Sequence, residues 1–146
     1  MERPHAPADA DATARAAAEA MWARDEASRS LGIAVEEVRP GYARATLHVG
    51  EHMLNGHGSC HGGYIFALAD SAFAFACNSG GVTTVAAGAD IVFVAPVRAG
   101  DGLVAEARER ALYGRSGIYD VTVRRSDGAV VAEFRGRSRA ARTSAG

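Results

Sequence analysis

Residues 62–79, GGYIFALADSAFAFACNS, decide the fold of this chain. The stretch is rich in alanine and apolar on nearly every face of a helical projection, so a helix formed from it has to be buried all round. Asp70 is the only acidic or basic residue in it. We therefore expect one long hydrophobic helix over about residues 61–79, surrounded by the rest of the domain.

Strand-like segments stand on both sides of this helix. They share a run of alternating or β-branched apolar residues and are separated by turn sequences rich in glycine. The six segments are residues 33–38, 42–49, 82–97, 102–113, 117–125 and 129–139. This order predicts an α+β domain in which a curved, mostly antiparallel sheet wraps around the central helix.

The ends of the chain depart from this pattern. Residues 9–30 are rich in alanine, glutamate and arginine and are followed by Gly32, which predicts an N-terminal helix with a glycine stop. Residues 1–8 and 141–146 are expected to be flexible tails. The length of 146 residues then leaves a single domain over residues 9–140.

Composition excludes several function classes. The 17 acidic and 16 basic residues give a net charge of −1, whereas a general nucleic-acid binder usually has a clear positive excess. All basic residues are arginine, and they concentrate in residues 98–146, which offers a local site for an anion. The longest charge-poor run is too short for a membrane span. Two cysteines and the absence of a secretory signal predict a cytoplasmic protein without disulfides.

Asp70 does not fit a plain core helix, because burying a lone carboxylate costs free energy. Three structural explanations remain open: the residue caps a break in the helix, pairs with an arginine from a strand, or emerges at a surface. The functional explanation is a carboxylate held for chemistry, with its pKa set by the surroundings.

The loop before the helix supplies groups that complement such a carboxylate. A helix N-terminus presents unpaired backbone N–H groups, and Gly62 and Gly63 leave them uncovered by side chains. An oxyanion that develops during a reaction can be held there. Asn55 can donate an amide hydrogen bond or position a water molecule. A purely structural explanation is that the glycines of this loop only form turns.

The spacing between these groups has a consequence. Gly62 and Asp70 are eight residues apart, which is about 12 Å along a helix. A catalytic group must lie within about 3 Å of its target, or one water molecule away. If both residues act on one substrate, they therefore come from two chains whose helices run antiparallel across a two-fold axis.

The histidines and a cysteine of the loop suggest a metal site or a thiol nucleophile. His52, His57 and His61 with Cys60 do not have the spacing of a helical zinc motif, and few carboxylates lie nearby, so we expect no metal. A Cys60 nucleophile would need an activating base, for which only the adjacent His61 is present. His61 is expected to orient the loop instead.

Several motifs resemble the hotdog-fold thioesterases and, within them, the phenylacetate-degradation (PaaI-type) subfamily. They are residues 55–63 (NGHGSCHGG), 68–72 (LADSA), 77–79 (CNS), 117–121 (GIYDV) and 134–138 (FRGRS). The resemblance runs from about residue 21 to residue 139. It implies a hotdog fold, and an acyl-CoA thioesterase that hydrolyses phenylacetyl-CoA or hydroxyphenylacetyl-CoA to the free acid and CoA.

The resemblance also implies roles for individual residues. Asp70 would be the essential carboxylate, either as nucleophile or as the base for water. The backbone N–H of Gly62 would polarise the thioester carbonyl. Asn55, near the attacking group, and His61 would support the site. Ser71 stands where the family often has a small hydroxylated residue.

Partners follow from the same resemblance. Family members are typically homotetramers built from dimers, with the active site between subunits, and they need no metal or redox cofactor. Gly63 and Ser71 are expected to contact the substrate, and Arg115 and Arg137 are candidates for its CoA phosphates, unless both arginines are simply solvated.

Three further functions remain open: a CoA-thioester dehydratase, a non-catalytic acyl-CoA sensor, and a thioesterase for different aromatic or medium-chain acyl groups.

Overall fold

The computed structural model describes residues 7–142. Residues 1–6 and 143–146 of the two predicted tails lie outside the described residues. The first helix, α1 (Pro7–Trp22), already begins inside the stretch predicted as a tail. The last described residues follow the final strand without regular structure.

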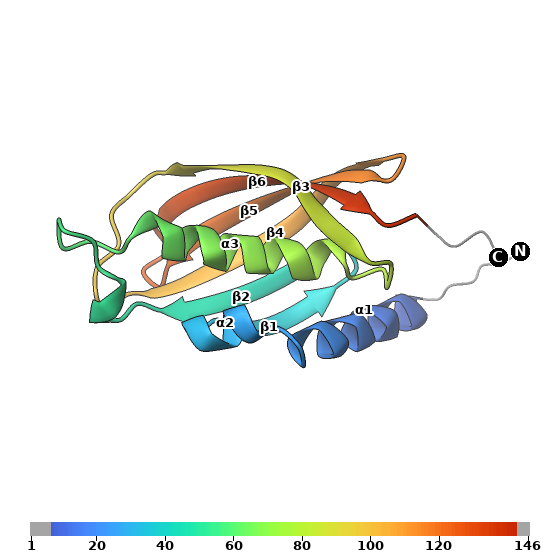
Figure 1. The fold of residues 1–146 in the computed structure, drawn as a ribbon, viewed down its shortest axis with the longest axis horizontal. Coiled ribbons are helices and arrows are strands. Elements are labelled where there is room, and N and C mark those ends of the chain that lie inside the picture. The colour runs from blue at the N-terminus through green and yellow to red at the C-terminus, as the bar shows by residue number, and fades with distance from the viewer. Residues whose placement is uncertain (1–6, 143–146) are drawn as a thin grey trace, which may run out of the picture.

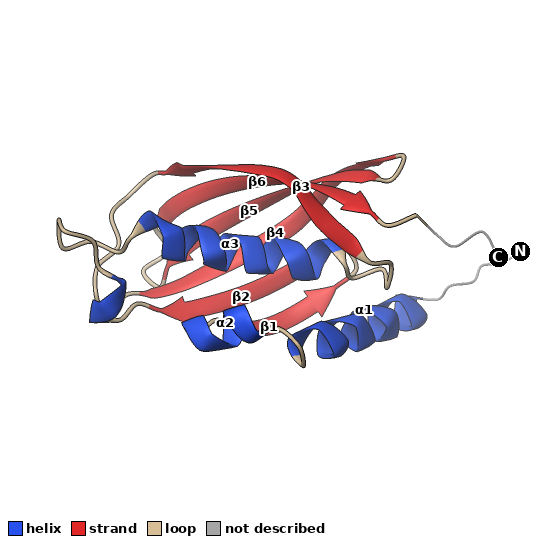
Figure 2. Ribbon diagram, viewed as in Figure 1, coloured by secondary structure: helices blue, strands red, loops and turns tan. Residues whose placement is uncertain are grey.

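A six-stranded antiparallel sheet curves around one long helix, as predicted (Figure 1). The helix is α3 (Gly62–Cys77), and it lies along the concave face of the sheet (Figure 2). The strands are β1 (Ala34–Arg39), β2 (Tyr42–His48), β3 (Thr84–Phe93), β4 (Gly102–Tyr113), β5 (Ser116–Arg125) and β6 (Val130–Ala140). Their order across the sheet is β1-β2-β4-β5-β6-β3.

The core forms where α3 meets the inner face of the sheet. Leu68, Ala69 and Ala72 of the helix are fully buried, as are the inward-facing residues of the central strands. Alternation along each strand places these residues on one face. Close approach requires small residues: a Cβ atom at Gly136 of β6 would lie 2.7 Å from the Phe73 ring. This packing holds α3 in a fixed position along the sheet.

The prediction of a single N-terminal helix is wrong in one respect, because residues 9–30 form two helices. A second helix, α2 (Glu26–Leu31), starts after Asp25, whose side chain accepts a hydrogen bond from the Ser28 backbone N–H at 2.9 Å. Aspartate is a strong N-cap, so it begins a new helix where one was expected to continue. Gly32, with φ of 84°, ends α2 as expected.

The central helix and the strand after it are both shorter than expected. His61 and Asn78 cap α3, so it spans Gly62–Cys77 within the predicted residues 61–79. The strand predicted over residues 82–97 is regular only in β3 (Thr84–Phe93), because Val94 and Ala95 then both donate to the Val131 carbonyl. A short 3₁₀ turn, η1 (Glu51–Met53), precedes the loop before α3.

β3 is an edge strand that leaves large apolar side chains uncovered. It pairs with β6 on one side, while Val85 and Val92 are 61% and 62% exposed and Phe93 is 52% exposed. A long, apolar, unpaired strand edge is a template for pairing with another chain unless something covers it.

None of the described helices has the length and apolar character needed to span a membrane.

Candidate active site

The loop of residues 55–59 is organised by the side chain of Asn55. Its Oδ1 accepts hydrogen bonds from the backbone N–H groups of His57 at 2.9 Å and Ser59 at 3.2 Å. The backbone of Asn55 also donates to the Ser59 carbonyl. Within the described residues nothing accepts a hydrogen bond from the Asn55 amide nitrogen. The loop therefore holds this amide in place and leaves its N–H groups available for a ligand.

His61 caps the start of α3. Its Nδ1 accepts a hydrogen bond from the backbone N–H of Gly63 at 3.0 Å, and its carbonyl accepts one from Tyr64. Cap residues satisfy the orphan donors of a first helical turn in this way. Among the described residues no group accepts a hydrogen bond from the backbone N–H of Gly62. The helix start thus presents one unclaimed donor, Gly62, while Gly63 is already engaged.

A cavity of about 430 Å³ opens beside this donor. Asn55, Gly62 and Phe93 are among the residues that line it. The Phe93 ring lies so close to Gly62 that a Cβ atom there would be 2.8 Å from the ring. Only glycine therefore fits at the first position of α3 with Phe93 in place. No sequence pattern points to Phe93 as part of this site, because the contact depends on how β3 crosses the helix start.

Asp70 lies two turns further along α3, on the side of the helix that the sheet does not cover. Ala67, Ala74 and Cys77 flank it on the same side and are also half-buried. No described side chain donates a hydrogen bond to the Asp70 carboxylate or forms an ion pair with it. Burial alone raises the pKa of Asp70 above its ordinary value. Helix α3 continues unbroken past Asp70, so a helix break does not explain this carboxylate. An arginine partner does not explain it either, because none of the described arginines forms an ion pair with Asp70.

These groups form two half-sites at separate places on one rigid helix. Gly62 and Asp70 belong to the same uninterrupted helix, so the separation of about 12 Å along its axis holds in the structure. The first half-site combines an unclaimed backbone N–H with the Asn55 amide, which suits an oxyanion and an attacking water. The second supplies a desolvated carboxylate, which suits a base or nucleophile.

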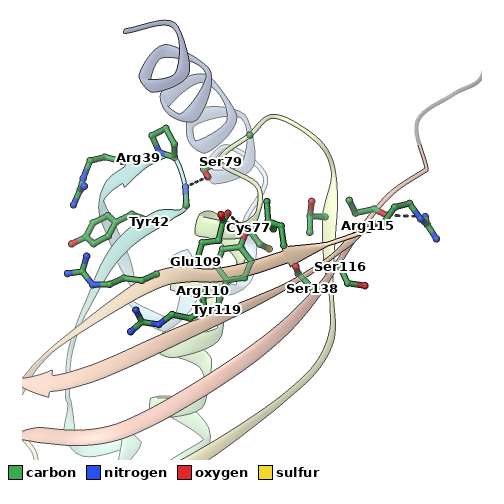
Figure 3. Close-up of a pocket in the computed structure, with 18 residues that line it drawn as sticks. Arg39, Tyr42, Cys77, Ser79, Glu109, Arg110, Arg115, Ser116, Tyr119 and Ser138 are labelled. Carbon is green, nitrogen blue, oxygen red and sulfur yellow. Dashed lines mark hydrogen bonds between the residues drawn. The ribbon is translucent and has the colours of Figure 1, made fainter. Parts of the chain in front are cut away.

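A second, larger cavity of about 660 Å³ lies at the other end of α3 (Figure 3). The turn between β1 and β2, the turn between β4 and β5, and the end of β6 surround it. Cys77 lines it from the last turn of α3, on the same side of the helix as Asp70. The cavity therefore continues the half-buried side of α3 beyond Asp70. The sequence did not point to it, because its walls come from segments far apart in the chain.

Ser71 is turned away from Asp70 and toward α2. Its hydroxyl lies 2.8 Å from the Ser28 hydroxyl, which in turn donates to Asp25 at 2.7 Å. This chain of hydrogen bonds ties the N-terminal part of the protein to the middle of α3. The substrate contact predicted for Ser71 remains a prediction, and its hydroxyl already has a partner within the chain.

The two arginines predicted to bind CoA phosphates lie in different places. Arg115 lines the larger cavity and donates to the Ala140 carbonyl at 3.1 Å. Arg137 lies on the outer face of the sheet and forms an ion pair with Asp90 at 3.1 Å. The structure therefore brings Asn55, His61, Gly62 and Gly63 together at the start of α3 and leaves these arginines apart from them.

The local geometry does not favour Cys60 as a nucleophile. Cys60 is buried, its thiol donates to the His61 carbonyl, and burial raises its pKa, which disfavours the thiolate. Over residues 7–142 no three His, Cys, Asp or Glu side chains gather as ligands for a metal ion.

Comparisons with known proteins agree with this geometry. Residues 57–132, which include most of the loop and the whole of α3, match the family model described as "Thioesterase superfamily". The chain is 45% identical over 121 residues to the acyl-coenzyme A thioesterase PaaI of Escherichia coli, with 83% of this chain and 86% of that protein covered.

Solved structures show the same fold. The structure of the Escherichia coli PaaI protein from the phenylacetic acid degradation operon matches with a TM-score of 0.89 and 41% identity, over 92% of this chain and 97% of that one. A point mutant of the phenylacetic acid degradation protein PaaI from Thermus thermophilus matches with a TM-score of 0.74 and 38% identity, over 77% of this chain and 96% of that one.

Proposed function

Since this chain belongs to the thioesterase superfamily and is a thioester hydrolase, we propose that its substrates are acyl-CoA thioesters with an aryl-acetyl acyl group. Phenylacetyl-CoA and hydroxyphenylacetyl-CoA are the members of this class that we expect it to cleave, within phenylacetate catabolism. The names of the Escherichia coli and Thermus thermophilus relatives support this choice. The observation that carries the hydrolysis itself is the pairing of one unclaimed donor, Gly62, with one unpartnered carboxylate, Asp70.

The chemistry follows from the two half-sites. The Gly62 N–H donates to the thioester carbonyl oxygen and stabilises the negative charge that develops there. Asp70 either takes a proton from a water molecule that attacks the carbonyl carbon, or attacks that carbon itself to form an anhydride that water then cleaves. The Asn55 amide positions the water. In both routes the carbon–sulfur bond breaks, CoA leaves as its thiol, and the acid is released.

The site needs two copies of the chain. Because Gly62 and Asp70 are about 12 Å apart on one rigid helix, the partner's helix has to supply the other half. The exposed edge of β3 is the surface that a second copy would cover by strand pairing. Antiparallel pairing of two β3 strands across a two-fold axis would bring the cavity at the start of one α3 toward Asp70 of the other. A homodimer or homotetramer follows.

Neither a metal nor a redox cofactor enters this proposal, since the backbone donor and the carboxylate supply the electrophilic and basic groups. CoA takes part only as a portion of the substrate. Both cysteines are free thiols, which supports the cytoplasm as the place of action because that compartment keeps thiols reduced.

A substrate series tests the proposal. Thiol release would be followed with phenylacetyl-CoA, hydroxyphenylacetyl-CoA, a short aliphatic acyl-CoA and a long-chain acyl-CoA. Asp70→Asn should lower kcat/KM for the aryl-acetyl esters by about a thousandfold, within the usual range for a lost acid–base group. Asp127→Asn, which removes an exposed carboxylate in the turn between β5 and β6, is the matched control and should retain activity.

Two results would overturn the proposal. If the wild type binds acyl-CoA but cleaves none of the four esters, the protein is a sensor and not a hydrolase of this class. If the aliphatic esters are cleaved far better than the aryl-acetyl ones, the assigned substrate class is wrong.

A further inference from the structure

The larger cavity contains one carboxylate that no described cation neutralises, Glu109. It lies on β4 directly opposite Tyr119 of β5. The Tyr119 hydroxyl donates to Glu109 Oε1 at 3.1 Å, and this is the only hydrogen bond that the described residues make to that carboxylate. Glu109 is exposed to the cavity, so its second oxygen is free to accept from a ligand.

The core holds this pair in place. Tyr119 is 3% exposed, and its ring packs against Phe73 of α3 with centroids 5.7 Å apart. The buried ring fixes its hydroxyl, and the hydroxyl in turn fixes the Glu109 carboxylate. In Figure 3, Glu109, Cys77 and Tyr119 lie together in the middle of the cavity. A preorganised acceptor of this kind discriminates between ligands better than a mobile one.

The arginines around the cavity do not turn it into a phosphate site. Three of them form ion pairs with carboxylates, and the fourth donates to a backbone carbonyl. The four are Arg39, Arg108, Arg110 and Arg115. A phosphate placed among them would also face the charge of Glu109. An uncharged group that donates a hydrogen bond fits the interior better.

The cavity and Asp70 lie on the same side of α3, because Cys77 lines the cavity. Cys77 is two helical turns beyond Asp70 on the same side of α3, a separation of about 10 Å along the axis. Burial, together with the nearby charge of Asp70, raises the pKa of the Cys77 thiol to about 12. A substrate whose carbonyl lies at Asp70 would extend its acyl group along this side of α3 toward the cavity.

We propose that Glu109 selects acyl groups whose far end carries a hydrogen-bond donor, and that Tyr119 positions it for this task. The inference rests on the proposed function, since it places the acyl portion of the substrate in this cavity. A ring hydroxyl donates to the free Glu109 oxygen. A ring without a donor desolvates the carboxylate and forms no hydrogen bond that offsets this cost.

The test compares pairs of substrates. kcat/KM would be measured for 4-hydroxyphenylacetyl-CoA and phenylacetyl-CoA, and the ratio of the two values is the readout. Glu109→Gln should lower this ratio by about tenfold or more, because a hydrogen bond to a charged acceptor is lost. Tyr119→Phe should lower it less, since the acceptor remains but is no longer held. Glu133→Gln is the control. This exposed glutamate also accepts a hydrogen bond from a hydroxyl, that of Thr122, but it lies on the outer face, so the ratio should not change.

The outcomes separate this inference from the proposed function. An unchanged ratio in Glu109→Gln, with wild-type hydrolysis intact, overturns the role of Glu109 and leaves the hydrolase standing. An equal drop in KM for both esters would mean that the cavity receives the anionic CoA portion, which also overturns it. Calorimetry with the uncleavable thioethers of CoA that carry phenacyl or 4-hydroxyphenacyl groups tests the preference without turnover. If the wild type binds both thioethers equally, the inference is wrong whether or not the esters are cleaved.

Discussion

The first turn of α3 and the middle of the same helix are built in opposite ways. At the first turn local hydrogen bonds hold the groups in place: the His61 ring accepts a hydrogen bond from the Gly63 N–H, and Asn55 Oδ1 accepts two from the loop backbone. Among the described residues the Gly62 N–H and the Asn55 amide N–H groups have no acceptor. In the middle, Asp70 has no partner among the described residues, and burial opposes its charge. The donor half-site is thus complete within one chain, whereas the carboxylate half-site is costly until something else completes it.

This difference indicates which half each kind of change should damage. Changes in the first turn act through backbone geometry. The loss of a hydrogen bond can therefore be separated from a steric effect by comparing two side chains at the same position. Changes at Asp70 act through charge, so their effects on activity and on folding should have opposite signs. Substitutions in each half-site test these two statements, and a mixture of two chains tests whether a second chain joins the halves.

Among the substitutions in the first turn, Gly62→Pro should produce the largest effect. Proline is well tolerated at the first position of a helix, and the extended His61 before it is compatible with a following proline. The change therefore removes the N–H while keeping the helix start. Loss of one such donor lowers kcat by about 100-fold to 1000-fold.

Gly62→Ala is the matched control for this change. Its Cβ meets the Phe93 ring much as the proline ring does, but it retains the N–H. The ratio of the kcat values of the two variants therefore isolates the donor. Equal activities in the two variants would show that displacement of Phe93, and not the lost hydrogen bond, accounts for the defect.

Mixing two inactive chains should restore activity if the halves come from different chains. When Asp70→Asn and Gly62→Pro chains exchange freely, half of the dimers are mixed, and one of the two sites in each mixed dimer is intact. About a quarter of the wild-type activity should return in thiol-release assays. Chain exchange would be confirmed with two affinity tags. No recovery in a mixture that has exchanged would place both half-sites in one chain and contradict the shared site.

His61→Ala should have a moderate effect on both stability and turnover. Loss of the N-cap costs about 1 kcal/mol of folding free energy, and it frees the Gly63 N–H to compete with Gly62 for the oxyanion. We expect kcat to fall about tenfold, because the first turn then holds the Gly62 N–H less precisely toward the thioester carbonyl. His61→Asn restores a capping side chain and should recover most of the loss. His57→Ala, in the same loop, should behave like the wild type, since only the backbone of His57 takes part in the loop hydrogen bonds.

The same contrast explains what the sequence could and could not predict. Local patterns sufficed for the central helix, the succession of strands along the chain and the loop residues, because helix caps, turns and alternation act between neighbours in the chain. The break at Asp25 was missed, although a strong capping residue stands there, because the alanine-rich composition on both sides favours one continuous helix. Phe93 over Gly62, and Glu109 opposite Tyr119, depend on strand register, which residues distant in sequence set jointly.

The smallest expected effect is on stability. Because the pKa of Asp70 is raised in the folded protein, the folded state binds a proton more readily than the unfolded state, and the ionised carboxylate destabilises the fold. Asp70→Asn should therefore be more stable than the wild type at pH 7. Thermal unfolding should show this as a small rise in Tm. The advantage should shrink as the pH falls through the raised pKa of Asp70, because the wild-type carboxyl is then neutral too. A variant less stable than the wild type at pH 7 would mean that the charge of Asp70 has a favourable partner in the assembly, and the carboxylate half-site would then be as complete as the donor half-site.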